Sequence, residues 1–296
     1  MIVGINVSDD PFVHITENAL TPSIGVELRG IEVSGNLPQP FVQRIKDGLR
    51  DRLVVRLRDQ RLSDPELLSF SRLLGELDPP GPNPYGTPFI PEFPELNVIS
   101  NVVENGRPLG NLGAGEAVWH ADLTYIDTPP QAAVLYALEI PPDGGATYFA
   151  NMYAAYDALS ADLKERIGGM IAVHDGSLNS AGMLRKGYQE VTDARHTVGA
   201  HHPIVWTNPD TERKCLFLGR RKNSYVLGLS LAESEALLDV LWECATQSAF
   251  VMKHEWRVGD VLIWNNLCTL HRRDSFESDA RRVLHRTQIR GTLPVH

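Results

Sequence analysis

The feature that most constrains the fold is a series of short apolar or alternating runs that occupies the chain from Leu96 onward. Turn residues separate these runs, and few of them are long enough for an ordinary helix. The runs are LNVIS, AAVLYALEI, ATYFANM, GMIAVHDG, HPIVWTN, KCLFLG, FVMKHEW, DVLIWNN and VLHRTQIRG. Many short strands with turns between them are typical of sandwiches and jelly rolls. The sequence therefore predicts a mainly β fold of one of these two kinds.

Helical patterns accompany the predicted strands. PFVQRIKDGLRDRL has apolar residues at helical spacing, VVRLRD then reads as a strand, and SDPELLSFSRLLG begins at a possible N-cap, Ser63, and ends at Gly75. Further along, helices are expected around Tyr153 to Ile167 and in SLAESEALLDVLWECATQ, whose Ser230 and Glu233 resemble a capping box. We expect the later helices to brace the sheets from outside.

The chain reads as one domain covering residues 1–296. Its 296 residues and 43% hydrophobic content suffice for a large core, and it has no repeat or low-complexity tract. The Pro/Gly-rich segment from Gly75 to Glu95 is interpreted as an ordered loop rather than a linker. We expect an α/β N-terminal layer over about 1–95 and a β core over about 96–296, with helices flanking the sheets.

Charge and cysteine content limit the possible partners. The formal net charge of -9 argues against non-specific binding to nucleic acid or to an anionic membrane, and favours a small-molecule substrate. Three cysteines without a CxxC pair predict neither a disulfide framework nor a thiolate zinc site. The first residues lack the basic and apolar regions of a signal peptide, and no apolar run approaches a membrane span. A cytoplasmic protein is expected.

Two histidines and one aspartate form the most informative pattern. In EAVWHADLTY, His120 and Asp122 are two residues apart on an expected strand or strand end, so both side chains project to one face. This pair alone also fits a surface pair or a hydrogen-bonded His–Asp. His271, after the predicted strand GDVLIWNN, offers a third ligand. Two histidines and one carboxylate form the facial triad of non-haem iron(II) oxygenases, which leaves coordination sites open for catalysis.

Two arginines follow His271 and could bind an anion. Arg282 and Arg286 are four residues apart, so in a strand they share a face with Leu284. Such a partly apolar face suits a buried receptor for a carboxylate, because arginine donates paired, charge-assisted hydrogen bonds. The alternative is that either arginine is a solvated charge on an edge strand.

Taken together, these motifs resemble the taurine dioxygenase and dichlorophenoxyacetate dioxygenase enzymes, the TauD/TfdA-like family. The resemblance covers nearly the whole chain, including GVELRGIEVSG, FSRLLGEL, VWHADLTY, DTPPQAAVLYALEIPPDGGATYFANMYAAYDAL, HPIVWTNPDTERKCLFL, WNNLCTLHRRDSF and RRVLHRTQIRG. It implies a double-stranded β-helix, a jelly roll, with a long insertion between the metal-bearing strands. The residues that match the iron(II) ligands are His120, Asp122 and His271.

The resemblance also implies 2-oxoglutarate and O2 as co-substrates. Thr147, in GGATYF, and Arg282 match the groups that bind the distal carboxylate of 2-oxoglutarate. Arg286 matches an arginine near the metal-chelating end of 2-oxoglutarate and near the substrate anion. Relatives are often dimers or tetramers, so a homo-oligomer is expected. Retention of Asp122 argues against a halogenase, because that chemistry needs the carboxylate removed to admit halide.

Departures from the taurine enzyme bear on the substrate. Where that enzyme uses a histidine on the sulfonate, this chain has Asp78 followed by two prolines, so taurine itself is not expected. Glu116 replaces an asparagine and could pair with a cationic substrate group, but we favour an orientation toward water. WNN replaces the more usual WDN, so Asn265 could orient the metal strand without adding a charge.

The expected reaction is hydroxylation of a small anionic substrate with an aliphatic or aryl-ether body, releasing succinate and CO2. Cleavage of a C–S, C–O or C–N bond could follow. The alternatives are a zinc-dependent hydrolase and a non-catalytic jelly-roll binding module built on the same three residues. Arg282 and Thr147 favour the dioxygenase, because a hydrolase needs no carboxylate receptor there. Other residues could line the substrate pocket or simply belong to core and surface: Trp119, Trp264, His196, His201 and His202.

Overall fold

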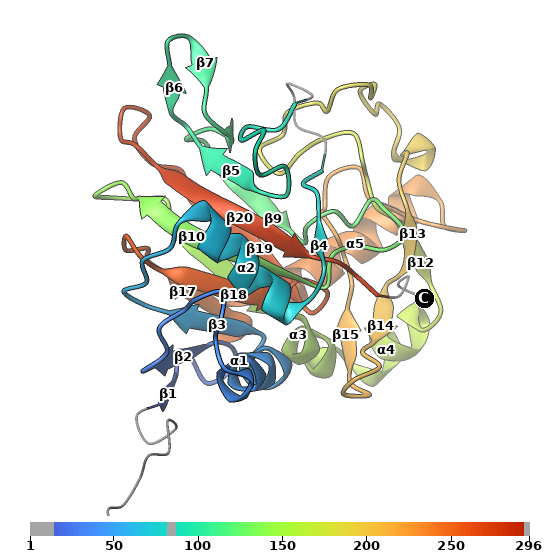
Figure 1. Cartoon of the computed structure of the whole chain (residues 1–296). Helices are drawn as coiled ribbons and strands as arrows, with labels where there is room; N and C mark the ends of the chain where they lie inside the picture. Colours follow the sequence, from blue (N-terminus) through green and yellow to red (C-terminus); the bar gives the residue numbers. More distant parts are fainter. Residues whose placement is uncertain (1–14, 82–86, 293–296) are drawn as a thin grey trace, which may run out of the picture.

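A computed structural model describes residues 15–81 and 87–292 (Figure 1). Its largest sheet has the strand order β1-β2-β3-β18-β10-β20-β5-β8, and β4 pairs with β20. These strands are β1 (Thr16–Ala19), β2 (Val26–Arg29), β3 (Val54–Leu57), β18 (Val261–Asn265), β10 (Ala132–Glu139), β20 (Val283–Ile289), β5 (Asn97–Ser100), β8 (Asn111–Leu112) and β4 (Leu77–Asp78). Strands from both ends of the chain therefore build one sheet.

A smaller sheet packs against the large one. Its order is β17-β11-β19-β9, and its strands are β17 (Val251–His254), β11 (Thr147–Asn151), β19 (Thr269–Arg273) and β9 (Ala117–His120). Phe149 of β11 lies 5.5 Å from Trp264 of β18, measured between ring centroids, so the core between the sheets is closely packed. The mainly β architecture predicted from the short apolar runs is confirmed.

The central strands of the large sheet are buried on both faces. In β18, Leu262 and Trp264 belong to the core between the sheets, whereas Val261 and Ile263 belong to a second core on the opposite face. Helices α1 (Gln39–Arg52) and α2 (Asp64–Leu74) cover that face, and α2 lies across β20 (Figure 1). Burial on both faces explains why these strands read as continuous apolar runs.

The helix boundaries follow local sequence signals. Ser63 and Ser230 are N-caps, and in each the backbone N–H donates to a glutamate three residues later, at 2.8 Å in α2 and 2.9 Å in α5 (Leu231–Ala245). The helical stretch predicted from Tyr153 to Ile167 is divided into α3 (Met152–Ala158) and α4 (Ala161–Ile167). Ser160 causes the division, because its hydroxyl accepts from the Leu163 N–H and starts a new helix.

Residues 152–250 form a long insertion between β11 and β17, within the part of the chain between β9 and β19, for which the family resemblance implied an insertion. It contains α3, α4, α5, and the 3-10 helices η2 (Ala194–His196) and η3 (Ser248–Phe250). Its strands are β12 (Ile171–Val173), β13 (His201–Pro203), β14 (Val205–Thr207), β15 (Lys214–Leu216) and β16 (Tyr225–Val226). The loop between β12 and β13 contributes residues to the lining of a cavity that also contains His120 and Asp122.

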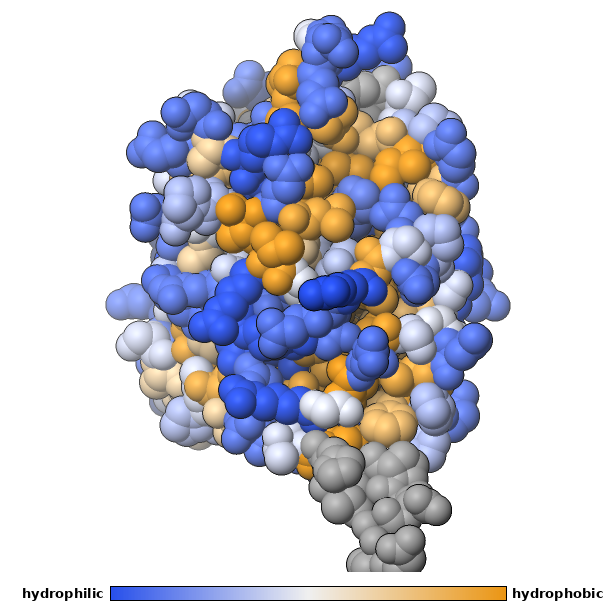
Figure 2. All heavy atoms as spheres, turned by 60° about the vertical axis from the view of Figure 1, so that its left-hand side comes forward, coloured by the Kyte–Doolittle hydropathy of each residue, from blue (hydrophilic) through white to orange (hydrophobic). Residues whose placement is uncertain are grey.

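A small hairpin, β6 (Val103–Glu104) with β7 (Arg107–Pro108), projects from the end of β5. Figure 2 shows a face on which hydrophilic side chains surround small groups of apolar ones. Among the described residues, none of the helices is long and apolar enough to cross a membrane. The predicted loop from Gly75 to Glu95 contains β4, and its residues 82–86 lie outside the described residues.

Candidate active site

The three predicted metal ligands meet at the end of the smaller sheet. His120 is the last residue of β9, and its Cα partner across the sheet is His271 of β19. Asp122 follows two residues after His120, and its Oδ1 lies 3.7 Å from His120 Nε2 and 3.9 Å from His271 Nε2. One ligand atom from each residue lies within 4.8 Å of the others, and all three residues are buried. This donor set fits Fe(II), since it is two imidazoles and one carboxylate.

The two histidines present free nitrogen lone pairs to this centre. His120 Nδ1 lies 2.8 Å from the Val118 carbonyl oxygen and therefore carries the proton, which leaves Nε2 as the ligand atom. Burial, together with the neighbouring His120, holds the pKa of His271 well below its usual value. His271 is thus neutral, as a metal ligand must be. The Trp264 ring packs 5.1 Å from the His271 ring and limits its rotation.

Arg286 and Asn266 hold Asp122 in place. Nη1 of Arg286 donates to both carboxylate oxygens of Asp122, at 2.8 and 2.9 Å. Burial by itself would raise the pKa of Asp122, but Arg286 and the two histidines lower it far below its usual value. Asn266 accepts from the Asp122 N–H at 2.8 Å and donates to the Asp122 carbonyl at 2.9 Å. The carboxylate is therefore ionised and fixed from both its side chain and its backbone.

The two asparagines of WNN make different contacts. Asn265 Oδ1 accepts from the backbone N–H groups of Leu267 and Cys268, both at 3.1 Å, and so shapes the turn that leads into β19. Asn266, which we did not single out in the sequence, is the one that contacts Asp122. Its side chain is fully buried, and a buried amide needs partners of this kind.

A cavity beside the three candidate ligands contains the residues predicted to bind 2-oxoglutarate, and we call it the 2-oxoglutarate cavity for that predicted role. Thr147, Arg282 and Arg286 line it together with His120 and His271. Arg282 is 2% exposed, and its Nε has no hydrogen-bond partner among the described residues. Burial, with a smaller contribution from Arg273, holds the pKa of Arg282 well below its usual value. None of the described carboxylates pairs with Arg282, so a carboxylate ligand fits this site and would relieve the cost of burying its charge.

Two residues here were missed by the sequence analysis: Arg273, which lines this cavity, and Trp256, which contacts Thr147 but is not part of the described lining. Trp256 donates from Nε1 to Thr147 Oγ1 at 2.9 Å, so the Thr147 hydroxyl proton is free to point elsewhere. Arg273, on β19 opposite Thr147, also lines the cavity, and burial lowers its pKa to about 10. The cavity therefore holds more positive charge than the two arginines in the sequence pattern implied.

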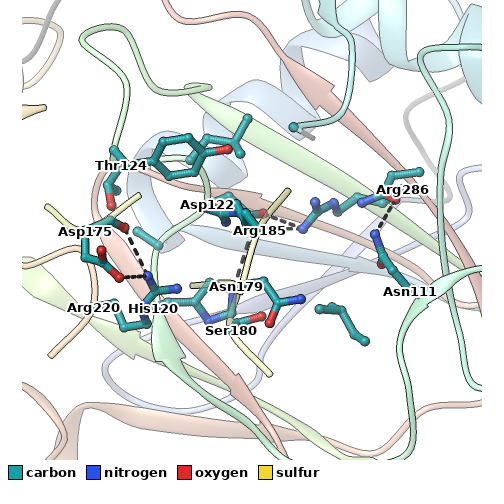
Figure 3. Close-up of a pocket in the computed structure, with 16 residues that line it drawn as sticks. Asn111, His120, Asp122, Thr124, Asp175, Asn179, Ser180, Arg185, Arg220 and Arg286 are labelled. Carbon is teal, nitrogen blue, oxygen red and sulfur yellow. Dashed lines mark hydrogen bonds and ion pairs between the residues drawn. The ribbon is translucent and has the colours of Figure 1, made fainter. Parts of the chain in front are cut away.

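A second cavity lies on the other side of the triad, with His120, Asp122 and Arg286 in its wall (Figure 3). Its lining also includes asparagine and serine side chains and further charged groups: Asn97, Asn111, Asp175, Asn179, Ser180, Arg185 and Arg220. Because this cavity also adjoins the candidate metal ligands His120 and Asp122, it is the candidate cavity for the primary substrate, and we call it the substrate cavity.

Comparison with known proteins agrees with this geometry. Residues 16–288 match the family model described as "Taurine catabolism dioxygenase TauD, TfdA family". The chain belongs to this family. An alpha-ketoglutarate-dependent 2,4-dichlorophenoxyacetate dioxygenase from Cupriavidus pinatubonensis is 34% identical, over 92% of this chain and 96% of the relative. An alkylsulfatase from Acinetobacter baylyi is 31% identical, over 96% and 87%.

Solved structures support the same conclusion. A putative alpha-ketoglutarate-dependent taurine dioxygenase from Burkholderia xenovorans superposes with a TM-score of 0.77 at 28% identity, covering 95% of this chain and 91% of that one. AAD-2, in complex with Mn(II) and N-oxalylglycine, also gives 0.77, at 26% identity over 95% and 99%. The jelly-roll prediction is confirmed. As a TauD/TfdA family member, the chain is a dioxygenase that uses Fe(II), 2-oxoglutarate and O2.

Several minor expectations can now be compared with the geometry. Trp264 lines the 2-oxoglutarate cavity, whereas Trp119 lies outside both linings, with Arg272 5.5 Å from its ring. The Glu116 side chain is 60% exposed, which agrees with an orientation toward water. Three histidines are absent from the described linings of both cavities: His196, His201 and His202. His202 is instead buried, and its Nε2 lies 2.8 Å from the carbonyl oxygen of Thr124.

Proposed function

We propose that this dioxygenase binds Fe(II) through His120, Asp122 and His271 and hydroxylates a small anionic organic substrate. The observation that carries the proposal is the cavity of Arg282. A buried, uncompensated arginine stands next to three metal-ligand side chains, and only a small acidic co-substrate that also reaches the metal satisfies both features. A zinc hydrolase would leave this arginine unexplained.

In this proposal Arg282 and Thr147 bind the distal carboxylate of 2-oxoglutarate. Arg282 supplies charge-assisted donors, and Thr147 supplies its hydroxyl proton because Trp256 already occupies an acceptor site on Thr147 Oγ1. Arg286 stands in the wall of both cavities, near the position of the metal-chelating end of the co-substrate. The bound Fe(II), with 2-oxoglutarate and O2, supplies the oxidising chemistry that inserts one oxygen atom into substrate and yields succinate and CO2.

The other residues orient and shield the reacting groups. Arg286 keeps Asp122 ionised, and Asn266 fixes the backbone of Asp122. Packing of Trp264 against His271 holds the imidazole plane toward the metal. If the hydroxylated carbon also bears sulfur, oxygen or nitrogen, the product collapses and the carbon–heteroatom bond breaks. The names of the 2,4-dichlorophenoxyacetate dioxygenase and alkylsulfatase relatives support such substrates.

The first test is O2 consumption by protein loaded anaerobically with Fe(II), with 2-oxoglutarate and a panel of alkylsulfonates, alkyl sulfates, aryloxyalkanoates, phosphonates and amino acids. We expect one class to stimulate O2 uptake with an equal amount of succinate. Protein loaded with Zn(II) is the control and should remain inactive. Absence of 2-oxoglutarate-dependent uptake, even at background level, or turnover with zinc instead of iron, would contradict the proposal.

We also propose that residues 1–296 act as one domain and assemble into a homodimer or tetramer. Pairing of β3 with β18 joins the N-terminal layer to the core and supports the single domain. The oligomer rests on analogy with the family. Light scattering coupled to gel filtration measures the assembly, and a monomer at micromolar concentration would contradict it.

A further inference from the structure

Charges in the substrate cavity do not balance. Three arginines and two aspartates line it: Arg185, Arg220, Arg286, Asp122 and Asp175. Arg286 pairs with Asp122, and Arg220 pairs with Asp175 at 3.0 Å; Figure 3 shows the two pairs on opposite sides of the cavity. The cavity therefore contains one arginine more than its aspartates neutralise, although the whole chain is acidic.

The unbalanced charge is that of Arg185. Its Nη1 donates to the Gly176 carbonyl at 3.0 Å, and its guanidinium carbon lies 4.1 Å from the centroid of the Tyr125 ring. No carboxylate of the described residues forms an ion pair with it. Asp175 cannot serve as one, because its oxygens accept from Arg220 and from the backbone N–H groups of Ser177 and Leu178. A guanidinium has five N–H donors, and the contact to Gly176 uses only one.

The backbone places Arg185 in the cavity wall. Its loop is closed by a bridge between Leu178 and Leu184, and the Arg185 N–H donates to the Ser177 carbonyl at 2.8 Å. Asn179 Oδ1 accepts from the Met183 N–H at 2.9 Å and stabilises the turn between the bridged residues. Together with the Tyr125 contact, this geometry keeps the half-buried Arg185 side chain in the lining of the cavity.

We propose that Arg185 is the receptor for the anionic group of the primary substrate, which is an oxyanion: a carboxylate, sulfonate or sulfate. This inference rests on the proposed function of the same site. Arg286 is less suited to the task, because its Nη1 is committed to Asp122. The substrate anion accordingly lies on the side of the loop from Asp175 to Arg185, and the carbon to be oxidised lies between that loop and His120. Paired oxygens accept from the free edge of the guanidinium.

The test compares Arg185→Gln and Arg185→Lys with Arg195→Gln. Arg195 lies in the same β12–β13 loop, but it is paired with Asp193 on the surface and is not among the residues that line the cavity. The probes are phenoxyacetate, hexyl sulfate and the neutral phenoxyacetamide. Binding to anaerobic Fe(II)- and 2-oxoglutarate-loaded protein is measured by calorimetry, and KM and kcat by succinate formation.

For Arg185→Gln we expect a Kd for the bound oxyanion about 10- to 100-fold higher than in the wild type. Arg185→Lys should recover part of this loss, while Arg195→Gln should bind as the wild type does. The Kd for 2-oxoglutarate and the weak binding of phenoxyacetamide should not change. Preference for phenoxyacetate over hexyl sulfate, or the reverse, distinguishes a carboxylate from a sulfate substrate.

The proposal is overturned if Arg185→Gln binds the oxyanion as tightly as the wild type does. It is also overturned if the wild type binds neither oxyanion, or if it binds phenoxyacetamide more tightly than phenoxyacetate. These outcomes are separable from failure of the proposed function. If wild-type protein lacks 2-oxoglutarate-dependent O2 uptake, the dioxygenase site is at fault. If uptake is normal and only the Arg185 variants behave as wild type, the anion receptor alone is wrongly assigned.

Discussion

Replacement of Arg282 by methionine tests the 2-oxoglutarate cavity most directly. The Arg282 side chain is among the largest that are fully buried, and no described carboxylate pairs with it. In the complex with 2-oxoglutarate, Arg282 would pair with the distal carboxylate at a position that water does not reach. Loss of one partner from a buried ion pair costs about 3–5 kcal/mol, which corresponds to a roughly 100- to 5,000-fold weaker Kd for 2-oxoglutarate.

The same substitution should have the opposite effect on the ligand-free protein. Burial of Arg282 without a counter-ion is unfavourable, as the lowered pKa of this arginine also indicates. Methionine replaces the aliphatic stem of the arginine and removes the buried charge, so the free energy of unfolding should rise by about 1–3 kcal/mol. A more stable ligand-free protein together with weaker binding of 2-oxoglutarate would not be expected if Arg282 had only a structural role.

Calorimetry with anaerobic Fe(II) protein measures the first effect, and urea unfolding of the metal-free protein measures the second. Arg281→Met is the matched control, because Arg281 is the preceding residue and its side chain is half exposed and paired with Glu139. It should leave both quantities close to wild type. Wild-type affinity for 2-oxoglutarate in Arg282→Met would refute the assignment, and destabilisation of the ligand-free variant would refute the argument that this charge is uncompensated.

Three further predictions concern buried polar contacts, two of them beside the site. Trp256→Phe removes the donor to Thr147, so KM for 2-oxoglutarate should rise about 2- to 10-fold with little change in kcat, measured by succinate formation. Asn266→Ala frees the backbone of Asp122, so Fe(II) affinity measured by competition with a chelator should fall about 10- to 100-fold. Burial alone would raise the pKa of Asp260, but its histidine and arginine partners lower this pKa below its usual value. Asp260 therefore stabilises the folded protein above the pKa that it has in the unfolded chain, and this contribution is lost in acid. Asp260→Asn should therefore cost about 3–5 kcal/mol at pH 7 and flatten the decline in stability below about pH 4, measured by urea unfolding.

Each of these has a control and a contradicting result. Trp242→Phe also deletes a buried indole N–H, but one without a partner among the described residues, so unchanged KM is expected there and a rise equal to that of Trp256→Phe would show a general packing effect. Asn266→Asp keeps the acceptor and should lose less metal affinity than Asn266→Ala; an equal loss would argue against the backbone contact. Asp193→Asn alters an exposed pair and should leave the unfolding curve unchanged. A pH profile of Asp260→Asn identical to wild type would contradict the burial argument.

Local and periodic signals made much of this molecule predictable. Ser63 and Ser230 cap their helices through a glutamate three residues away, and such contacts need no information from the rest of the chain. Likewise, His120 and Asp122 are neighbours in sequence, and alternation along a strand is enough to turn both toward one place. The helix break at Ser160 was also encoded locally, but the apolar spacing on both sides of it favoured a single helix.

Contacts between distant segments were not predictable. Asn266 reaches Asp122 from 144 positions away, and Trp256 reaches Thr147 from 109 positions away. Asparagine and tryptophan occur at many positions of any chain, and nothing in their immediate neighbours distinguishes these two. Pairing of β11 with β17 brings Trp256 to Thr147, and pairing of β9 with β19 brings Asn266 to Asp122.

The sequence by itself determined the kind of fold and the helix caps, and it singled out the three candidate metal-ligand residues, because each depends on short-range spacing or on a short motif. Only the tertiary structure decided how the arginines divide their tasks. Arg286 is committed to Asp122, Arg220 to Asp175, and Arg282 and Arg185 are left without a described carboxylate. The reason is physical: whether a guanidinium is neutralised depends on the distance to a carboxylate and on exclusion of water, and both are set by the packing of strands and loops that are far apart in the chain.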